Sequence, residues 1–342
     1  MNTVRQNRPV ILWLLTGCLL IFIMVVVGGI TRLTNSGLSM TDWHLVTDTF
    51  PPTTEEKWHQ AFEDYKQYPE YKLINSQKDF TLDDYKFIYF WEWFHRFIGR
   101  VIGLVFVIPF VYFLIQKKLS SETIKKCLFL FGLGALQAFF GWYMVKSGLI
   151  DNPDVSHFRL SLHLTTAFIT FAATLWVALD LIYPDRRPAI ANLRKLMMGT
   201  LAVLLLQIIW GGFVAGLNAG LIHNHWPMMS DGQFLHDSVF LERETWYAAL
   251  TEGKSGVQFV HRMLAYVVVF MVLFTFAKSR KTTLDTTTQK GFSVMVALLG
   301  LQFGLGIYTL LAGVPLWLGL AHQIGAFFLL SSVTFVLHRV SK

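Results

Sequence analysis

Eight long apolar blocks constrain this chain of 342 residues more than any other feature. Each block has about 20 residues, the length of α-helix that crosses a hydrocarbon core of about 30 Å. A helix pairs all of its backbone polar groups internally, as a bilayer requires. The blocks are expected at residues 10–30, 94–115, 127–146, 160–182, 196–217, 257–277, 291–312 and 317–338. The sequence therefore predicts an all-α integral membrane protein with eight transmembrane helices.

The net charge of +7 is explained by membrane topology rather than by a nucleic-acid partner. Only 15% of the residues are charged, against about 25% in soluble domains. The basic residues gather at both ends of the chain and in every second loop, which places those parts and both termini in the cytoplasm. The clusters are Arg5/Arg8, Lys117/Lys118/Lys125/Lys126, Arg186/Arg187/Arg194/Lys195, Lys278/Arg280/Lys281/Lys290 and Arg339/Lys342. We expect no nucleic-acid partner.

Two connections on the outer side are long. Residues 32–88 form an acidic and aromatic loop, which includes Asp42 and Asp48 and is interrupted by Pro51 and Pro52. The patterns over 55–65 and 82–90 predict short amphipathic helices. Residues 218–256 form the second long loop. The first apolar block resembles a signal peptide in length, but it lacks a clear small-residue cleavage site, so we interpret it as a retained span.

The chain contains an internal repeat. Gly28-Gly29, Asn35 and Gly37-Leu38 recur as Gly211-Gly212, Asn218 and Gly220-Leu221, at an offset of 183 residues. Gln137, Gly141 and Tyr143 recur as Gln302, Gly306 and Tyr308. Each half has four spans, so both halves enter the membrane from the same side, as in parallel repeats. We predict two pseudo-symmetric four-helix bundles, 1–190 and 191–342, related by an axis along the membrane normal.

Four histidines are candidate metal ligands: His95, His163, His261 and His322. Each lies about one turn inside the outer end of a span, at matching points of the two halves. An imidazole in a membrane helix is costly without a partner, so it indicates a functional site. Two pairs on the outer, periplasmic side favour two bis-histidine sites, and iron in a porphyrin fits such pairs best.

A carboxylate distinguishes the two halves. Glu92 stands three residues before His95 and so shares a helix face with it, whereas the corresponding residue before His261 is Gln258. An acid–base group is useful at a reacting site and unnecessary where only electrons pass. Pairing with Arg96 or helix capping is the alternative role of Glu92. Arg96 and Arg262 suit haem propionates, and snorkelling to the interface is their alternative.

The remaining histidines and cysteines give weaker signals. His223 and His225, with His236 nearby, have a spacing that could hold copper or zinc, but a polar surface loop is the favoured interpretation. Histidines without a repeat partner are expected at the surface: His44, His59, His157 and His338. Cys18 lies within the first span and Cys127 starts the third, and neither has CxxC spacing, so no disulfide is expected.

Several motifs in combination resemble those of the haem A synthase family, over nearly the whole chain. They are the run from Gly28 to Met40, Glu92-Trp93-Phe94-His95-Arg96, Leu136-Gln137 through Gly141-Trp142, and Ala215-Gly216-Leu217-Asn218-Ala219-Gly220. The run from Tyr65 to Glu70 is similar to the mitochondrial and proteobacterial branch. Other bacterial members carry a cysteine pair in the first outer loop, and this chain has no cysteine there.

The resemblance implies an enzyme of the bacterial inner membrane that oxidises the C8 methyl group of haem O to the formyl group of haem A. It implies that His95 and His163 hold the substrate haem beside the catalytic Glu92. His261 and His322 would ligate a resident haem b. Implied partners are an external electron-transfer protein, haem O synthase and cytochrome oxidase, and the chain could form homo-oligomers. A di-haem cytochrome b, a haem carrier and a secondary transporter remain alternatives.

Overall fold

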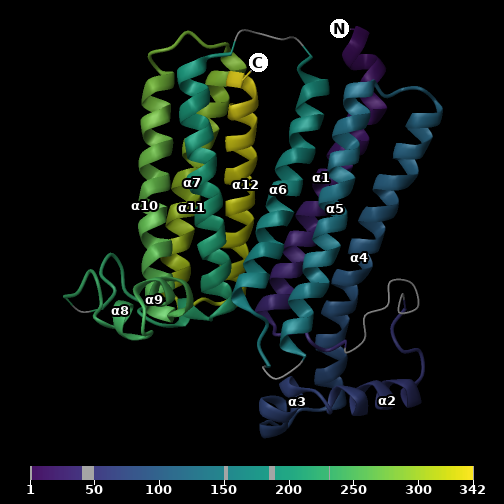
Figure 1. Cartoon of the computed structure of the whole chain (residues 1–342), viewed down its shortest axis with the longest axis vertical. Helices are drawn as coiled ribbons and strands as arrows, with labels where there is room; N and C mark the ends of the chain where they lie inside the picture. Colours follow the sequence, from purple (N-terminus) through teal and green to yellow (C-terminus); the bar gives the residue numbers. More distant parts are fainter. Residues whose placement is uncertain (1, 41–49, 150–152, 185–188, 231, 342) are drawn as a thin grey trace. The chain divides into compact units, whose positions relative to one another are not determined.

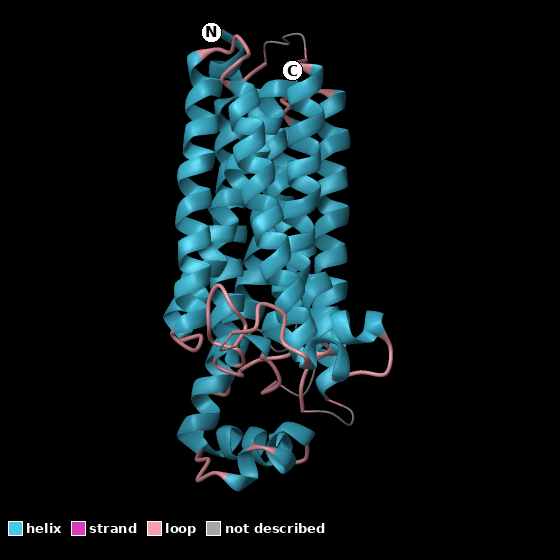
Figure 2. Cartoon of the chain, turned by 90° about the vertical axis from the view of Figure 1, so that its left-hand side faces the viewer, coloured by secondary structure: helices cyan, strands magenta, loops and turns pink. Residues whose placement is uncertain are grey.

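The computed structural model describes residues 2–40, 50–149, 153–184, 189–230 and 232–341. These residues form helices joined by loops, with no strand among them beyond an isolated bridge between Ser230 and Gln233 (Figure 2). Eight of the helices are long and apolar enough to cross a membrane. They are α1 (Asn2–Leu33), α4 (Leu82–Ile115), α5 (Ser121–Gly148), α6 (His157–Ile182), α7 (Ala191–Gly216), α10 (Lys254–Ser279), α11 (Thr286–Leu311) and α12 (Leu316–Ser341). The predicted all-α class with eight spans is confirmed.

The chain folds as two compact units, Leu19–His163 and a second that combines Met1–Cys18 with Leu164–Lys342. In the second unit α7, α10, α11 and α12 lie side by side, and the short helices α8 (Ser238–Leu241) and α9 (Trp246–Glu252) lie at the end where α10 begins (Figure 1). The expected division into two bundles at residue 190 follows the sequence repeat and stays a prediction.

In the unit Leu19–His163, the first outer loop forms a small aromatic core. The expected helix over 55–65 is confirmed as α2 (Glu55–Tyr65), and α3 (Pro69–Leu73) follows it beside the start of α4 (Figure 1). Phe62 and Tyr65 of α2 stack on Tyr85 of α4, with ring centroids 5.2 and 5.1 Å apart. This burial of aromatic surface holds α2 against α4.

Helix α4 differs from the expected pattern. The short helix expected over 82–90 and the span expected from residue 94 are one continuous helix of 34 residues. Thr81 and Asp84 form a capping box that starts it, and no helix breaker follows before the span. At 1.5 Å per residue the helix is about 51 Å long, so it extends well beyond a hydrocarbon core.

The glycine-rich exits of the repeat end in the same backbone conformation. Asn35 follows α1 with φ of 52°, and Asn218 follows α7 with φ of 53°. Asparagine tolerates this left-handed region better than other residues with a side chain, and it commonly ends helices there. The repeat found in the sequence therefore has a local structural counterpart in each half.

Some expectations concern residues that the structure does not describe. Asp42, His44, Asp48, Arg186 and Arg187 lie outside the described residues. Of the histidines expected at the surface, His59 is exposed and His157 is half-buried.

The surface position expected for His338 is wrong. Its side chain is 1% exposed in α12, and its Nε2 lies 2.9 Å from Oδ1 of Asp180 in α6. The Trp176 ring packs edge-on against the imidazole. Because Asp180 lies in the same compact unit, this buried pair joins α6 to α12.

We predict that Asp180→Ala destabilises the protein by about 1–3 kcal/mol, because it leaves a buried imidazole nitrogen without its partner. The measurement is the midpoint of thermal unfolding in detergent micelles. Asp180→Asn keeps an oxygen acceptor and serves as the control. Equal midpoints for the alanine variant and the unchanged protein would contradict a stabilising role for the pair.

Candidate functional site

Each of the four candidate histidines packs against a glycine of another span. The pairs are Gly28 with His95, Gly141 with His163, Gly211 with His261, and Gly306 with His322. A Cβ placed on these glycines would lie 2.8–3.2 Å from the nearest imidazole atom. Carbon atoms normally approach to about 3.5–4.0 Å, so even an alanine would push the ring. The glycines therefore make the space in which the imidazoles lie.

The imidazoles of the second candidate pair lie at a separation that suits two ligands of one metal. The rings of His261 and His322 have centroids 6.5 Å apart and lie nearly perpendicular, at 81°. Two imidazoles on opposite sides of one metal, with bonds of about 2 Å, would have ring centres about 6 Å apart. The separation of His261 from His322 would thus allow both residues to hold one iron.

Three of the histidines also contact a glutamine amide. Nε2 of Gln137 lies 3.1 Å from Nδ1 of His163 and donates to the backbone oxygen of the same histidine at 3.1 Å. Gln302 repeats both contacts with His322, at 3.2 and 3.0 Å. Nε2 of Gln207 lies 3.4 Å from Nε2 of His261. A metal-bound histidine commonly donates its other ring N–H to an acceptor, so the amide oxygen rather than Nε2 would be the partner of a metal-bound imidazole.

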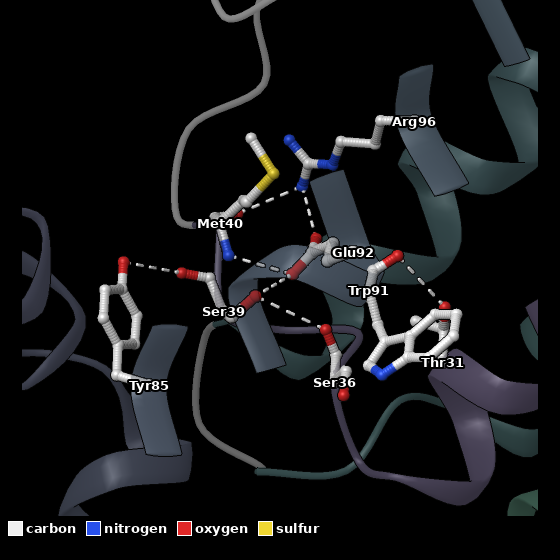
Figure 3. A network of polar contacts seen from close by, with 8 residues as sticks. All are labelled: Thr31, Ser36, Ser39, Met40, Tyr85, Trp91, Glu92 and Arg96. Carbon is white, nitrogen blue, oxygen red and sulfur yellow. Dashed lines mark hydrogen bonds and ion pairs between the residues drawn. The ribbon is translucent and has the colours of Figure 1, made fainter. Parts of the chain in front are cut away.

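Glu92 lies at the centre of a buried polar network (Figure 3). Its side chain is 4% exposed, and Oε1 forms an ion pair with Arg96 at 2.6 Å. Oε2 accepts hydrogen bonds from the Ser39 hydroxyl at 2.8 Å and from the Met40 N–H at 2.9 Å. Pairing with Arg96, the alternative role considered from the sequence, does occur. The contacts to Ser39 and Met40 additionally tie the carboxylate to the loop that follows α1.

Gln258 holds the position in the second half that Glu92 holds in the first, but it donates hydrogen bonds to its loop where Glu92 accepts them. Its amide donates to the backbone oxygens of Ala219, at 2.9 Å, and Ile222. Ile222 is the repeat counterpart of Ser39, at the offset of 183 residues. The loop before Glu92 thus presents donors to a carboxylate, and the loop before Gln258 presents acceptors to an amide. The difference inferred from the sequence extends to the surroundings of both side chains.

Both arginines bind the loops through backbone oxygens. Arg96 donates to the backbone oxygen of Met40 at 3.1 Å, and Arg262 donates to the backbone oxygen of His223 at 2.6 Å. His223 is the repeat counterpart of Met40. Arg262 also donates to Gln258 and to two further loop carbonyls. It is 9% exposed, so snorkelling does not describe it. A role of either residue in binding propionates stays a prediction.

The second outer loop does not gather a metal site among its described residues. His223 packs against His236, with ring centroids 4.5 Å apart, and lies 2.8 Å from the Ser255 hydroxyl. His225 contributes its backbone oxygen to Arg262. No group of three or more histidine, cysteine or acidic side chains close enough to hold a metal occurs in the described part of the chain. Cys18 and Cys127 form no disulfide, as expected, and both are buried.

Sequence reasoning did not single out several residues of these sites. Ser39 could have been found as part of the loop that follows the first glycine pair. Gln207, like Gln137 and Gln302, stands four residues before a glycine, and this shared spacing could have identified it as a site residue. Glu70 was one acidic loop residue among many, yet its side chain is buried and accepts a hydrogen bond from the Tyr65 hydroxyl at 2.9 Å.

Histidine pairs held by membrane helices, with a buried carboxylate beside one of them, define a class of integral membrane proteins suited to bind iron porphyrins. Over residues 11–334 the chain matches the family described as cytochrome oxidase assembly protein, COX15-CtaA. It is 67% identical to a Heme A synthase of Flavobacterium psychrophilum, over 99% of this chain and all of that protein.

More distant relatives extend the comparison. The chain is 44% identical to a Heme A synthase of Nitrosospira multiformis, over 98% of this chain and 94% of that protein. It is 40% identical to Heme A synthase COX15 of Saccharomyces cerevisiae, over 97% of this chain and 75% of that protein. The chain belongs to the haem A synthase family.

We predict that the first outer loop loses stability as the pH rises from about 4.5 to about 7. Burial, followed by the charges of Glu92 and Asp154, raises the pKa of Glu70 from 4.5 to about 7. Between these values the folded loop binds more protons than the unfolded one, so its stability falls with rising pH.

The measurement is amide hydrogen exchange of residues 55–80 across this pH range, corrected for intrinsic rates. Glu70→Gln should remove the dependence, whereas Glu63→Gln, at an exposed position, should retain it. A slope that persists in Glu70→Gln would assign the effect to another group.

Proposed function

We propose that this protein is a haem A synthase, which oxidises the C8 methyl group of haem O to a formyl group for cytochrome oxidase. The observation that carries the proposal is the difference between the two halves. The buried carboxyl group of Glu92 stands three residues before His95, whereas the neutral amide of Gln258 stands three residues before His261. Membership of the family and the similarity to proteins named Heme A synthase support the same activity.

The two histidine pairs have different roles in this proposal. His95 and His163 hold the substrate haem, and His261 and His322 hold a resident haem b. The glycine beside each imidazole and the separation of His261 from His322 support iron ligation. Haem b supplies one-electron transfer between the substrate site and an external partner. Arg96 and Arg262 contribute positive charge near each pair, where haem propionates would bind.

Glu92 acts on the methyl group that is oxidised. Its carboxylate either stabilises positive charge that develops on the methyl carbon or accepts a proton from an attacking water. With water as the oxygen source, each of two successive hydroxylations forms one C–O bond and removes two electrons and two protons, and the electrons pass one at a time to the external partner. The first hydroxylation gives an alcohol and the second a gem-diol, which loses water to form the aldehyde. Ser39, Met40 and Arg96 fix the carboxylate in one orientation, so its position is set before substrate binds.

The proposed location is the bacterial inner membrane, with both termini in the cytoplasm and the haem sites toward the periplasm. The basic clusters in alternate loops support this orientation. Residues 1–190 form the substrate half and residues 191–342 the haem b half. Haem O synthase and cytochrome oxidase are the proposed neighbours in supply and delivery, and self-association is compatible with the chain.

We predict that Glu92→Gln abolishes conversion of haem O, lowering the rate roughly 100-fold or more, because it removes the charge and the base but preserves shape. The measurement is extraction of porphyrins from membranes that contain the protein and a supply of haem O, with products separated by mass. The unchanged protein should give the hydroxylated and formyl forms.

The matched control is Glu70→Gln, the same change at another buried carboxyl, which should preserve conversion. If Glu92→Gln still forms haem A while both haems bind, the role of Glu92 is wrong. Recovery of haem B alone from the unchanged protein would favour an electron-transfer cytochrome. Bound but unaltered haem O would favour a carrier.

A further inference from the structure

Three of the four candidate histidines contact a glutamine amide, and His95 is the exception. Three spans carry a glutamine four residues before the glycine that packs on a histidine: Gln137 with Gly141, Gln207 with Gly211, and Gln302 with Gly306. Four residues are about one helical turn, so amide and glycine lie on one face and meet the same imidazole. On the fourth span the position before Gly28 is Met24.

Met24 cannot replace an amide. Its thioether is only a weak acceptor and has no donor. Its side chain packs beside Gly99, which lies one turn after His95 on α4: a Cβ placed on Gly99 would be 3.4 Å from Cε of Met24. Among the described residues no hydrogen bond reaches the imidazole of His95, whereas His163, His261 and His322 each have an amide contact. His95 is thus the ring with space but without a polar contact.

The three amides have the chemistry to serve metal-bound histidines. Oε1 of Gln137, Gln207 and Gln302 is buried and has no hydrogen-bond partner within the described part of the chain. A metal-bound imidazole carries an N–H on its other nitrogen, and that N–H is usually given an acceptor. Rotation of the amide by 180° exchanges its donor and acceptor ends, so Oε1 can accept from such an N–H. At Gln137 and Gln302 this acceptance replaces the bond that Nε2 donates to the backbone oxygen of the histidine. At Gln302, a Cβ on Gly325 would lie 2.0 Å from Oε1, so that glycine makes room for the amide.

We infer that Gln137, Gln207 and Gln302 are positioning residues that hold their histidines as fixed iron ligands, and that His95 is the exchangeable ligand. The inference rests on the proposed function. It assigns two amide-held histidines to the resident haem b. The substrate haem, which must enter and leave, has one amide-held ligand, His163, and one ligand without an amide. Release of His95 would free one iron ligand position near Glu92, which shares a face of α4 with His95.

The test exchanges the two residue types between the halves. In Gln207→Met, the rate at which haem leaves His261 and His322 for added apomyoglobin should rise roughly 10–100-fold. Effects of this size are usual when a residue that hydrogen-bonds to a metal ligand is removed. In Met24→Gln, carbon monoxide should bind more slowly to the reduced haem held by His95 and His163. Both readouts are absorption changes and do not depend on turnover.

Two further variants separate positioning from general damage. Gln207→Glu keeps an acceptor for the histidine N–H and should retain haem as the unchanged protein does. Gln289→Met makes the same substitution at an exposed position of α11 and should alter neither rate. Met24→Gln adds an interaction rather than removing one, so it remains informative if Gln207→Met does not fold.

Unchanged haem transfer in Gln207→Met, together with unchanged carbon monoxide binding in Met24→Gln, would overturn the inference. Failure of the proposed function is distinguishable, because it appears in the unchanged protein as haem O that binds and is not oxidised. Faster transfer in Gln207→Met and slower binding in Met24→Gln would support the inference even then.

Discussion

A histidine inside an apolar helix needs both space and a polar partner, because the bilayer provides neither. In this protein glycines on neighbouring spans provide the space at all four candidate histidines. Glutamines provide a polar contact at three of them. Each imidazole therefore takes part in a contact between helices. These contacts join α1 to α4 and α5 to α6, and in the second unit they join the helices around His261 and His322. Replacing one of these glycines would disturb a ligand and a helix contact together.

The two halves use one scaffold for opposite hydrogen-bond chemistry. Glu92 accepts from a serine hydroxyl and a backbone N–H, and Gln258 donates to backbone oxygens. In both halves the arginine four residues later binds a carbonyl of the same loop. The loop is therefore attached in the same way in each half. Only the side that faces Glu92 can hold a carboxylate without repulsion from carbonyl oxygens.

Much of the fold could be predicted from the sequence because long apolar runs and local repeats are properties of neighbouring residues. The eight spans, α2 and the repeated exits at Asn35 and Asn218 belong to this class. The burial of His338 could not be predicted in this way, since its partner Asp180 lies 158 residues earlier. The candidate histidines and Glu92 were found by comparing the halves. Gln207 was missed because its counterpart, Met24, is a different residue.

The opposed loops around Glu92 and Gln258 also have an evolutionary consequence. Glutamate and glutamine codons differ at a single base, so after duplication of an ancestral half one mutation could exchange the two residues. At position 258 such a mutation alone would leave a carboxylate facing carbonyl oxygens, whereas at position 92 the amide oxygen could still accept from the N–H and the hydroxyl. A carboxylate in the second half therefore needs a change in the loop from Ala219 to His223 as well as in the helix. Reversing the roles of the halves would need the same concerted change.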